Sequence, residues 1–154
     1  MKRNMILISV IIFIVSGILF LICLYNNQKQ NGRSQSIYVK INKLELKVQL
    51  ADNFGKRLRG LSDKEKISDR EGMFFIFNKP GYYPFWMKDI NFPLDIIWFD
   101  ENLKVIEIKK NLQPNSFPQT YQSAGLAKYV LEINAGLSDQ YDIKRGDKCF
   151  LDDI

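Results

Sequence analysis

The chain contains no histidine among its 154 residues and only two cysteines. Histidine is the usual general base near neutral pH and the commonest metal ligand. Its absence excludes Ser-His-Asp and Cys-His catalytic sites and histidine-based zinc sites. Cys23 lies in an apolar run and Cys149 near the C-terminus, so we expect no internal disulfide. We predict no metal site and no cofactor, and we expect Cys149 to be a small core residue.

The excess of basic residues is confined to the first third of the chain. The formal net charge is +5, and residues 56–154 carry equal numbers of acidic and basic side chains. This part offers no basic patch that could neutralise a run of phosphates, so we expect no nucleic-acid binding. Basic residues beside an apolar segment instead favour contact with anionic lipid head groups.

Residues 5–25 form an uncharged apolar run. As a helix it would span about 31 Å, which matches the ~30 Å hydrocarbon core of a bilayer. Lys2 and Arg3 precede the run and favour a cytoplasmic N-terminus. We therefore expect residues 1–25 to be a single-pass anchor in the cell membrane.

The anchor hypothesis sets the domain organisation. Residues 26–36 are polar and predict a tether, and residues 37–154 predict one globular domain on the extracytoplasmic side. A cleaved signal is an alternative, although the apolar core of such a signal is usually shorter, at ~7–15 residues. A lipoprotein signal at Cys23 is the other alternative, although Ile22 stands where a small residue is expected.

Short strands dominate the predicted globular domain. Apolar and polar residues alternate along 37–41 and 44–50, which predicts a hairpin through Asn42-Lys43. A second hairpin is predicted from 94–99 and 103–108. Further strands are expected at residues 73–77, 129–133 and 147–151, and short helices at 52–59, capped by Asp52 and ended by Gly60, and at 135–141.

Strands and helices do not alternate along these elements as they do in βαβ units. They predict a mainly β (β-rich α+β) fold, a compact antiparallel barrel or jelly-roll-like sandwich with one or two short helices.

Several short sequence strings occur in a fixed order along this domain. The strings are Arg59-Gly60-Leu61, Gly72-Met73-Phe74-Phe75, Phe85-Trp86-Met87-Lys88, Pro93-Leu94-Asp95, Tyr129-Val130-Leu131-Glu132 and Gly146-Asp147. Together they resemble domain-of-unknown-function family 192 over roughly residues 44 to 151.

The resemblance implies a compact barrel-like or jelly-roll-like domain and fits export, but it implies no reaction. The chain also departs from the family pattern. Relatives often read Met-Lys-Asn-Thr where this chain has 87–90, and many carry a cysteine pair where this chain has 114–116.

The candidate site residues lie within these strings. Trp86 and Met87 form a broad apolar face that could stack on a ring or a sugar, with core packing as the alternative. Lys88, Asp95 and Arg59 are candidate ligand contacts. Glu132 lies in an apolar string, and we expect it to form a structural ion pair, because a buried carboxylate needs a partner. The available bases are Arg57, Arg59 and Lys88.

Three functions are compatible with these residues. We favour a membrane-anchored module that binds a small ligand or an envelope partner, since aromatic clefts commonly hold ligands. The second hypothesis is a carboxylate-based hydrolase of envelope glycans that uses Asp95 and Glu132, which would need the two acids close together on one face. The third is a purely structural envelope protein.

Overall fold

The computed structural model describes residues 14–22, 36–62 and 64–152 of the chain. The chain divides into two compact units, Met1–Ser34 and Gln35–Ile154. In the first unit, residues 14–22 are helical. A search of the described residues finds no helix that is both long and apolar enough to span a bilayer. Most of the predicted span at 5–25 and of the predicted tether at 26–36 lies outside the described residues.

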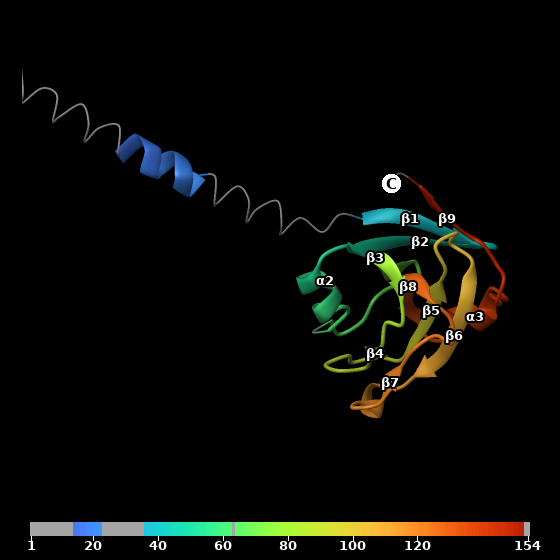
Figure 1. Cartoon of the computed structure of the whole chain (residues 1–154). Helices are drawn as coiled ribbons and strands as arrows, with labels where there is room; N and C mark the ends of the chain where they lie inside the picture. The colour runs from blue at the N-terminus through green and yellow to red at the C-terminus, as the bar shows by residue number, and fades with distance from the viewer. Residues whose placement is uncertain (1–13, 23–35, 63, 153–154) are drawn as a thin grey trace, which may run out of the picture. The chain divides into compact units, whose positions relative to one another are not determined.

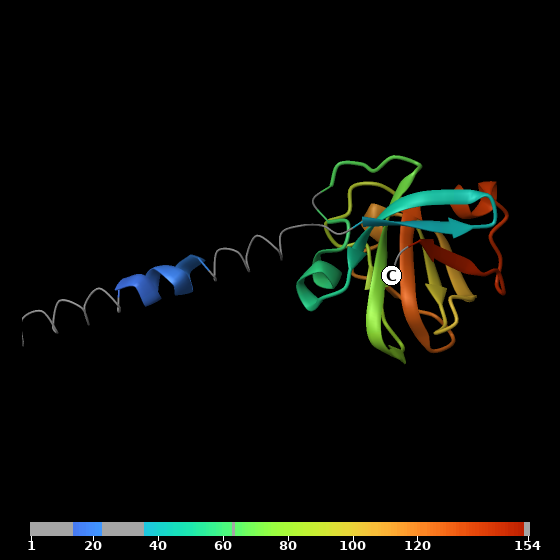
Figure 2. The same cartoon turned by 90° about the horizontal axis from the view of Figure 1, so that it is seen from above.

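The second unit is mainly β, as predicted. Its seven-stranded sheet is curled into a half-barrel in which the strand order is β6-β5-β8-β3-β2-β1-β9 (Figures 1 and 2). A short second sheet pairs β4 with β7. The strands are β1 (Ser36–Ile41), β2 (Leu44–Ala51), β3 (Glu71–Gly81), β4 (Phe85–Trp86), β5 (Leu94–Phe99), β6 (Val105–Leu112), β7 (Thr120–Tyr121), β8 (Ala127–Asn134) and β9 (Cys149–Asp152).

Three short helical segments accompany these strands. They are α2 (Phe54–Arg59), a 3₁₀ turn η1 (Pro114–Ser116) and α3 (Leu137–Gln140). Asn53, and not the expected Asp52, caps α2, because the Asn53 side chain accepts a hydrogen bond from the Lys56 amide at 3.0 Å.

Both predicted hairpins are present. In the first, β1 pairs antiparallel with β2 and Ile41 lies opposite Leu44. In the second, β5 pairs antiparallel with β6. Period-two alternation of apolar residues and a short turn define such pairs locally, which is why the sequence reveals them.

One connection differs from the prediction of a fold without βαβ units. β2 and β3 are parallel neighbours, and the chain between them, which includes α2, crosses over the sheet. Parallel strands need such a crossover because the chain must return to the same end of the sheet. This crossover places α2 beside the sheet, where it forms one side of the candidate site described below.

The curled sheet buries side chains on both faces. One face packs Phe74, Ile97 and Leu131 with the side chains of β1 and β2, and it also buries Cys149. The other face packs a second apolar cluster against the segments around α2 and β4. Burial on both faces explains why β3 and β5 read as continuous apolar runs. The prediction that Cys149 is a core residue is confirmed, and burial raises the pKa of its thiol to about 12.

Candidate functional site

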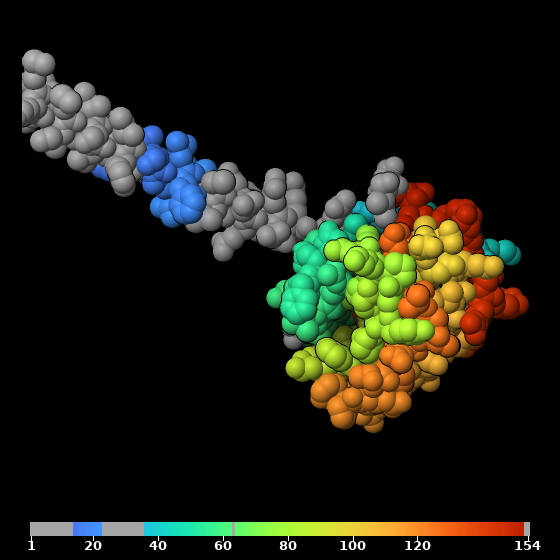
Figure 3. Space-filling view, in the orientation of Figure 1, coloured from blue at the N-terminus to red at the C-terminus, as the bar shows by residue number. Residues whose placement is uncertain are grey.

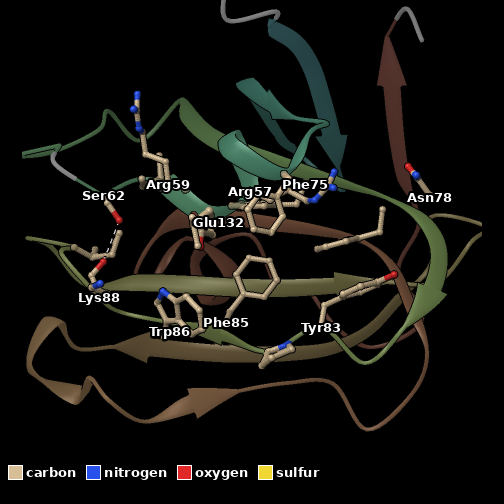
Figure 4. A pocket seen from close by; sticks show the side chains of 17 residues that line it. Arg57, Arg59, Ser62, Phe75, Asn78, Tyr83, Phe85, Trp86, Lys88 and Glu132 are labelled. Atoms are coloured by element: carbon tan, nitrogen blue, oxygen red, sulfur yellow. Dashed lines mark hydrogen bonds between the residues drawn. The ribbon is translucent and has the colours of Figure 1, made fainter. Parts of the chain in front are cut away.

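A cavity of about 440 Å³ opens between α2 and the segment that contains β4. Its lining comes from α2 and the residues after it, from β3, from the β3–β4 loop, from β4 and the turn after it, and from β8 (Figures 3 and 4). Its volume lies in the range typical of small-molecule sites, ~300–1,000 Å³. The lining residues include Arg57, Arg59, Gly60, Phe75, Phe77, Tyr83, Phe85, Trp86, Lys88 and Glu132.

Aromatic side chains form one wall of the cavity and hold one another in place. The rings of Phe77 and Tyr83 stack with centroids 3.5 Å apart, and Phe75 meets Phe85 edge-on at 4.8 Å. Behind them, Trp98 is fully buried and donates a hydrogen bond from Nε1 to the Tyr83 carbonyl at 3.3 Å. Because packed aromatic pairs favour such fixed geometries, these contacts hold the wall in one arrangement.

The opposite wall is the end of α2, where the backbone comes close to the sheet. Gly60 ends the helix with φ 55° and ψ −135°, a conformation that favours glycine. A Cβ atom at this position would lie 3.6 Å from Oε2 of Glu132. The glycine therefore lets the chain turn directly over the carboxyl group of Glu132.

Among the described residues that line the cavity, Glu132 is the only one with an acidic side chain. It is 4% exposed, and its Oε2 atom has no hydrogen-bond partner among the described residues. Burial raises the pKa of Glu132 from its ordinary value of 4.5 to about 8, so the group is mostly protonated at neutral pH. Figure 4 places it centrally among the labelled side chains.

The ion pair expected for Glu132 is not formed within the described part of the chain. Arg57 instead donates to the Ile76 carbonyl at 3.0 Å, and its guanidinium lies 5.3 Å from the ring centroid of Phe77. None of the ion pairs among the described residues involves Glu132, Arg59 or Lys88. The carboxyl group adapts to burial by staying neutral, which removes the need for a buried counter-charge.

Three of the residues singled out in the sequence lie together at this cavity. Trp86 is 38% exposed, and Arg59 and Lys88 are exposed residues that also line the cavity. The Ser62 hydroxyl donates to the Lys88 carbonyl at 3.0 Å and links the two sides of the opening (Figure 4). Residues separated by 26 positions in the chain thus meet at one opening.

Two other candidates lie elsewhere, contrary to expectation. Met87 is buried in the apolar cluster beneath the cavity, because neighbouring residues of an extended segment point to opposite sides. Asp95 is fully buried and does not line the cavity. Its Oδ1 accepts from the Asn111 amide at 2.9 Å, and its Oδ2 accepts from the Gly136 amide at 3.1 Å and from both the amide and the hydroxyl of Ser138 at 3.0 and 2.6 Å. Asp95 therefore joins β5 to the start of α3 and to the end of β6.

Asp95 and Glu132 also project from opposite faces of the sheet. Asp95 lies opposite Ile133 in the pairing of β5 with β8, whereas Glu132 lies opposite Ile96. Because opposed residues of neighbouring strands share a face, the two acids are on different sides. This arrangement excludes the two acids as the paired carboxylates of a glycan hydrolase.

The sequence pointed to Arg59 at the end of α2, but the two apolar residues that this helix adds to the site were missed. Phe54 and Leu58 lie one helical turn apart, are both exposed and both line the cavity. Their i, i+4 spacing was visible in the sequence, but only the parallel crossover brings this helix beside β4. No cluster of three or more potential metal-ligating side chains occurs within the described residues.

A protein-family model matches residues 37–151 of the chain, and that family is DUF192, described as "Uncharacterized ACR". The chain belongs to the DUF192 family. The match confirms the family resemblance that the ordered strings indicate. It spans nearly the whole β unit of this DUF192 protein. The family description names no reaction or ligand.

Two crystal structures resemble this DUF192 domain. A protein of unknown function from Novosphingobium aromaticivorans is 32% identical, with a TM-score of 0.73; the match covers 77% of this chain and 87% of that one. A proposed transcription regulator from Sinorhizobium meliloti is 26% identical, also with a TM-score of 0.73; the match covers 77% of this chain and 95% of that one. The comparison with curated proteins gives no match.

Proposed function

We propose that this DUF192 domain binds a small molecule in the cavity between α2 and β4. The observation that carries the proposal is a preformed aromatic cavity of about 440 Å³ with a buried carboxyl group that lacks a hydrogen-bond partner for Oε2 within the described chain. Most buried polar atoms in folded proteins have a partner, so an unpartnered one on a residue that lines a cavity supports a ligand atom at this place. Binding sites commonly combine apolar walls with a few such polar groups.

Trp86 is the best residue with which to test this function. We expect Trp86→Ala to weaken binding about tenfold, because loss of aromatic stacking typically removes ~0.5–1.5 kcal/mol in addition to the buried apolar area. Stability should fall less than on truncation of a fully buried tryptophan, since Trp86 is 38% exposed. The measurement is a thermal-shift screen of the full-length chain in lipid nanodiscs against aromatic metabolites, nucleotides and envelope sugars, because ligands stabilise the folded state by mass action.

A matched control comes from another exposed aromatic residue. Phe150 lies on β9 and does not line the cavity, so Phe150→Ala should keep the affinity of the wild type. Hits that bind wild type and Trp86→Ala equally well would place the ligand outside this cavity. A screen without hits would speak against a small-molecule function.

We further propose that the domain is held outside the cytoplasmic membrane by residues 1–25, with 26–36 as a tether. The proposal is supported by the uncharged run at 5–25 and by the basic residues that precede it. The full-length chain should remain in membranes after an alkaline carbonate wash, and protease added from outside should digest its C-terminal domain. Release by the wash, or protection from the protease, would refute this arrangement.

A further inference from the structure

The charged groups around the cavity indicate which class of ligand it accepts. Resting on the proposed function, we propose that the ligand is an apolar or aromatic carboxylate, which accepts a hydrogen bond from Glu132 while Arg59 and Lys88 balance its charge. The chain would then recognise an organic anion by its flat apolar body and its single acidic group.

Glu132 provides a carboxyl group at the cavity. Glu132 is 4% exposed and its Oε2 atom has no partner among the described residues. A protonated carboxyl group is both a donor and an acceptor, whereas an ionised one only accepts. The raised pKa of Glu132 keeps the proton in place at neutral pH, so the cavity offers a donor to the ligand. A carboxylate is a strong acceptor for such a donor.

Other titratable groups line the same cavity as Glu132. Among the described lining residues, α2 contributes Arg57 and, as its last residue, Arg59. The β3–β4 loop contributes Tyr83, and the segment after β4 contributes Lys88. With Glu132 protonated, these groups give the cavity a positive charge and no internal anion. A cleft lined by one sign of charge attracts ligands of the opposite sign.

The basic residues of the cavity differ in whether their side chains already have partners among the described residues. Arg57 is held by the Ile76 carbonyl and by the Phe77 ring. Arg59 and Lys88 make no side-chain hydrogen bond or ion pair with the described residues, and both line the opening. Their long side chains can therefore turn toward a bound anion without breaking a side-chain hydrogen bond or ion pair to a described residue.

The test uses three probes of the same shape but different charge. Full-length protein in nanodiscs of zwitterionic lipid is titrated calorimetrically at pH 6.5 with 2-naphthoate, 2-naphthamide and 2-naphthylmethylammonium. We expect 2-naphthoate to bind about tenfold more tightly than the ammonium, with the amide between them. Above pH 9 the advantage of 2-naphthoate should disappear, because an ionised Glu132 repels it and no longer donates.

Variants locate the selectivity within the cavity. Arg59→Gln and Lys88→Gln should each weaken 2-naphthoate several-fold and leave 2-naphthamide unchanged. Lys43→Gln removes the same charge from the exposed β1–β2 turn and should change neither affinity. Glu132→Gln keeps a side-chain donor without a titrating proton, so 2-naphthoate binding should become independent of pH between 6.5 and 9.5.

The outcomes distinguish this inference from the function on which it rests. If the amide or the ammonium binds as tightly as 2-naphthoate at pH 6.5, the inference is overturned and the binding function stands. If 2-naphthoate binds best but Arg59→Gln and Lys88→Gln leave its affinity unchanged, the inference is also overturned. If none of the three probes binds, the aromatic cavity itself fails as a ligand site.

Discussion

Replacing Glu132 with Gln is expected to remove a large pH dependence of the free energy of unfolding. The folded chain keeps Glu132 protonated up to pH about 8, whereas the unfolded chain releases the proton near pH 4.5. Between these values unfolding releases a proton, so the wild type loses stability as the pH rises. Since one pKa unit corresponds to ~1.4 kcal/mol, the loss amounts to roughly 5 kcal/mol by pH 8.

The measurement is urea unfolding of wild type and Glu132→Gln at intervals between pH 4.5 and 8.5. The difference between the two chains should be small at pH 4.5 and should grow in favour of the variant until pH about 8. Glu45 on β2 is exposed and provides the control, because Glu45→Gln should follow the wild type throughout. Parallel curves for wild type and Glu132→Gln would show that burial does not hold the proton on this group.

Asp95→Ala is expected to destabilise the fold by about 3–5 kcal/mol. The substitution leaves three backbone amides and the Ser138 hydroxyl without their acceptor, and unpartnered buried donors typically cost ~1–3 kcal/mol each before the structure relaxes. The free energy of unfolding from urea titration at pH 7 measures this effect. Ligand affinity should remain at the wild-type value, because Asp95 lies outside the cavity.

Asp52 provides the matched acid for this comparison. Its carboxylate pairs with Lys56 at 2.8 Å on the surface, and such exposed pairs contribute ~0–1 kcal/mol. Asp52→Ala should therefore change stability by less than about 1 kcal/mol. A similar small loss for Asp95→Ala would contradict the structural role assigned to its carboxylate.

The local parts of the fold could be predicted from the sequence, and the long-range parts could not. Alternation along β1 and β2 fixes both strands and their hairpin, because side-chain period and turn geometry are local properties. The parallel pairing of β2 with β3 depends on which strands become neighbours after the intervening chain of residues 52–70. Nothing in the turn chemistry of that chain distinguishes a crossover from a return hairpin.

The candidate site, too, could be predicted only in part from the sequence. Trp86, Lys88 and Arg59 could be singled out because they stand in the ordered strings that resemble the family. Asp95 and Glu132 look alike in the sequence, since each acid stands in an apolar strand. Their different environments follow from pairing register, which turns one acid toward α3 and the other toward the cavity.

The contrast between the two tryptophans gives the molecule a pair of separate optical reporters. Trp98 is fully buried beneath the aromatic wall, whereas Trp86 stands at the opening of the cavity. The chain has no third tryptophan. A ligand that covers Trp86 changes the long-wavelength part of the fluorescence emission, while the emission of Trp98 shifts only when the core opens. In a Trp86→Phe variant the remaining signal follows unfolding alone, so cavity occupancy and folding can be recorded separately by light.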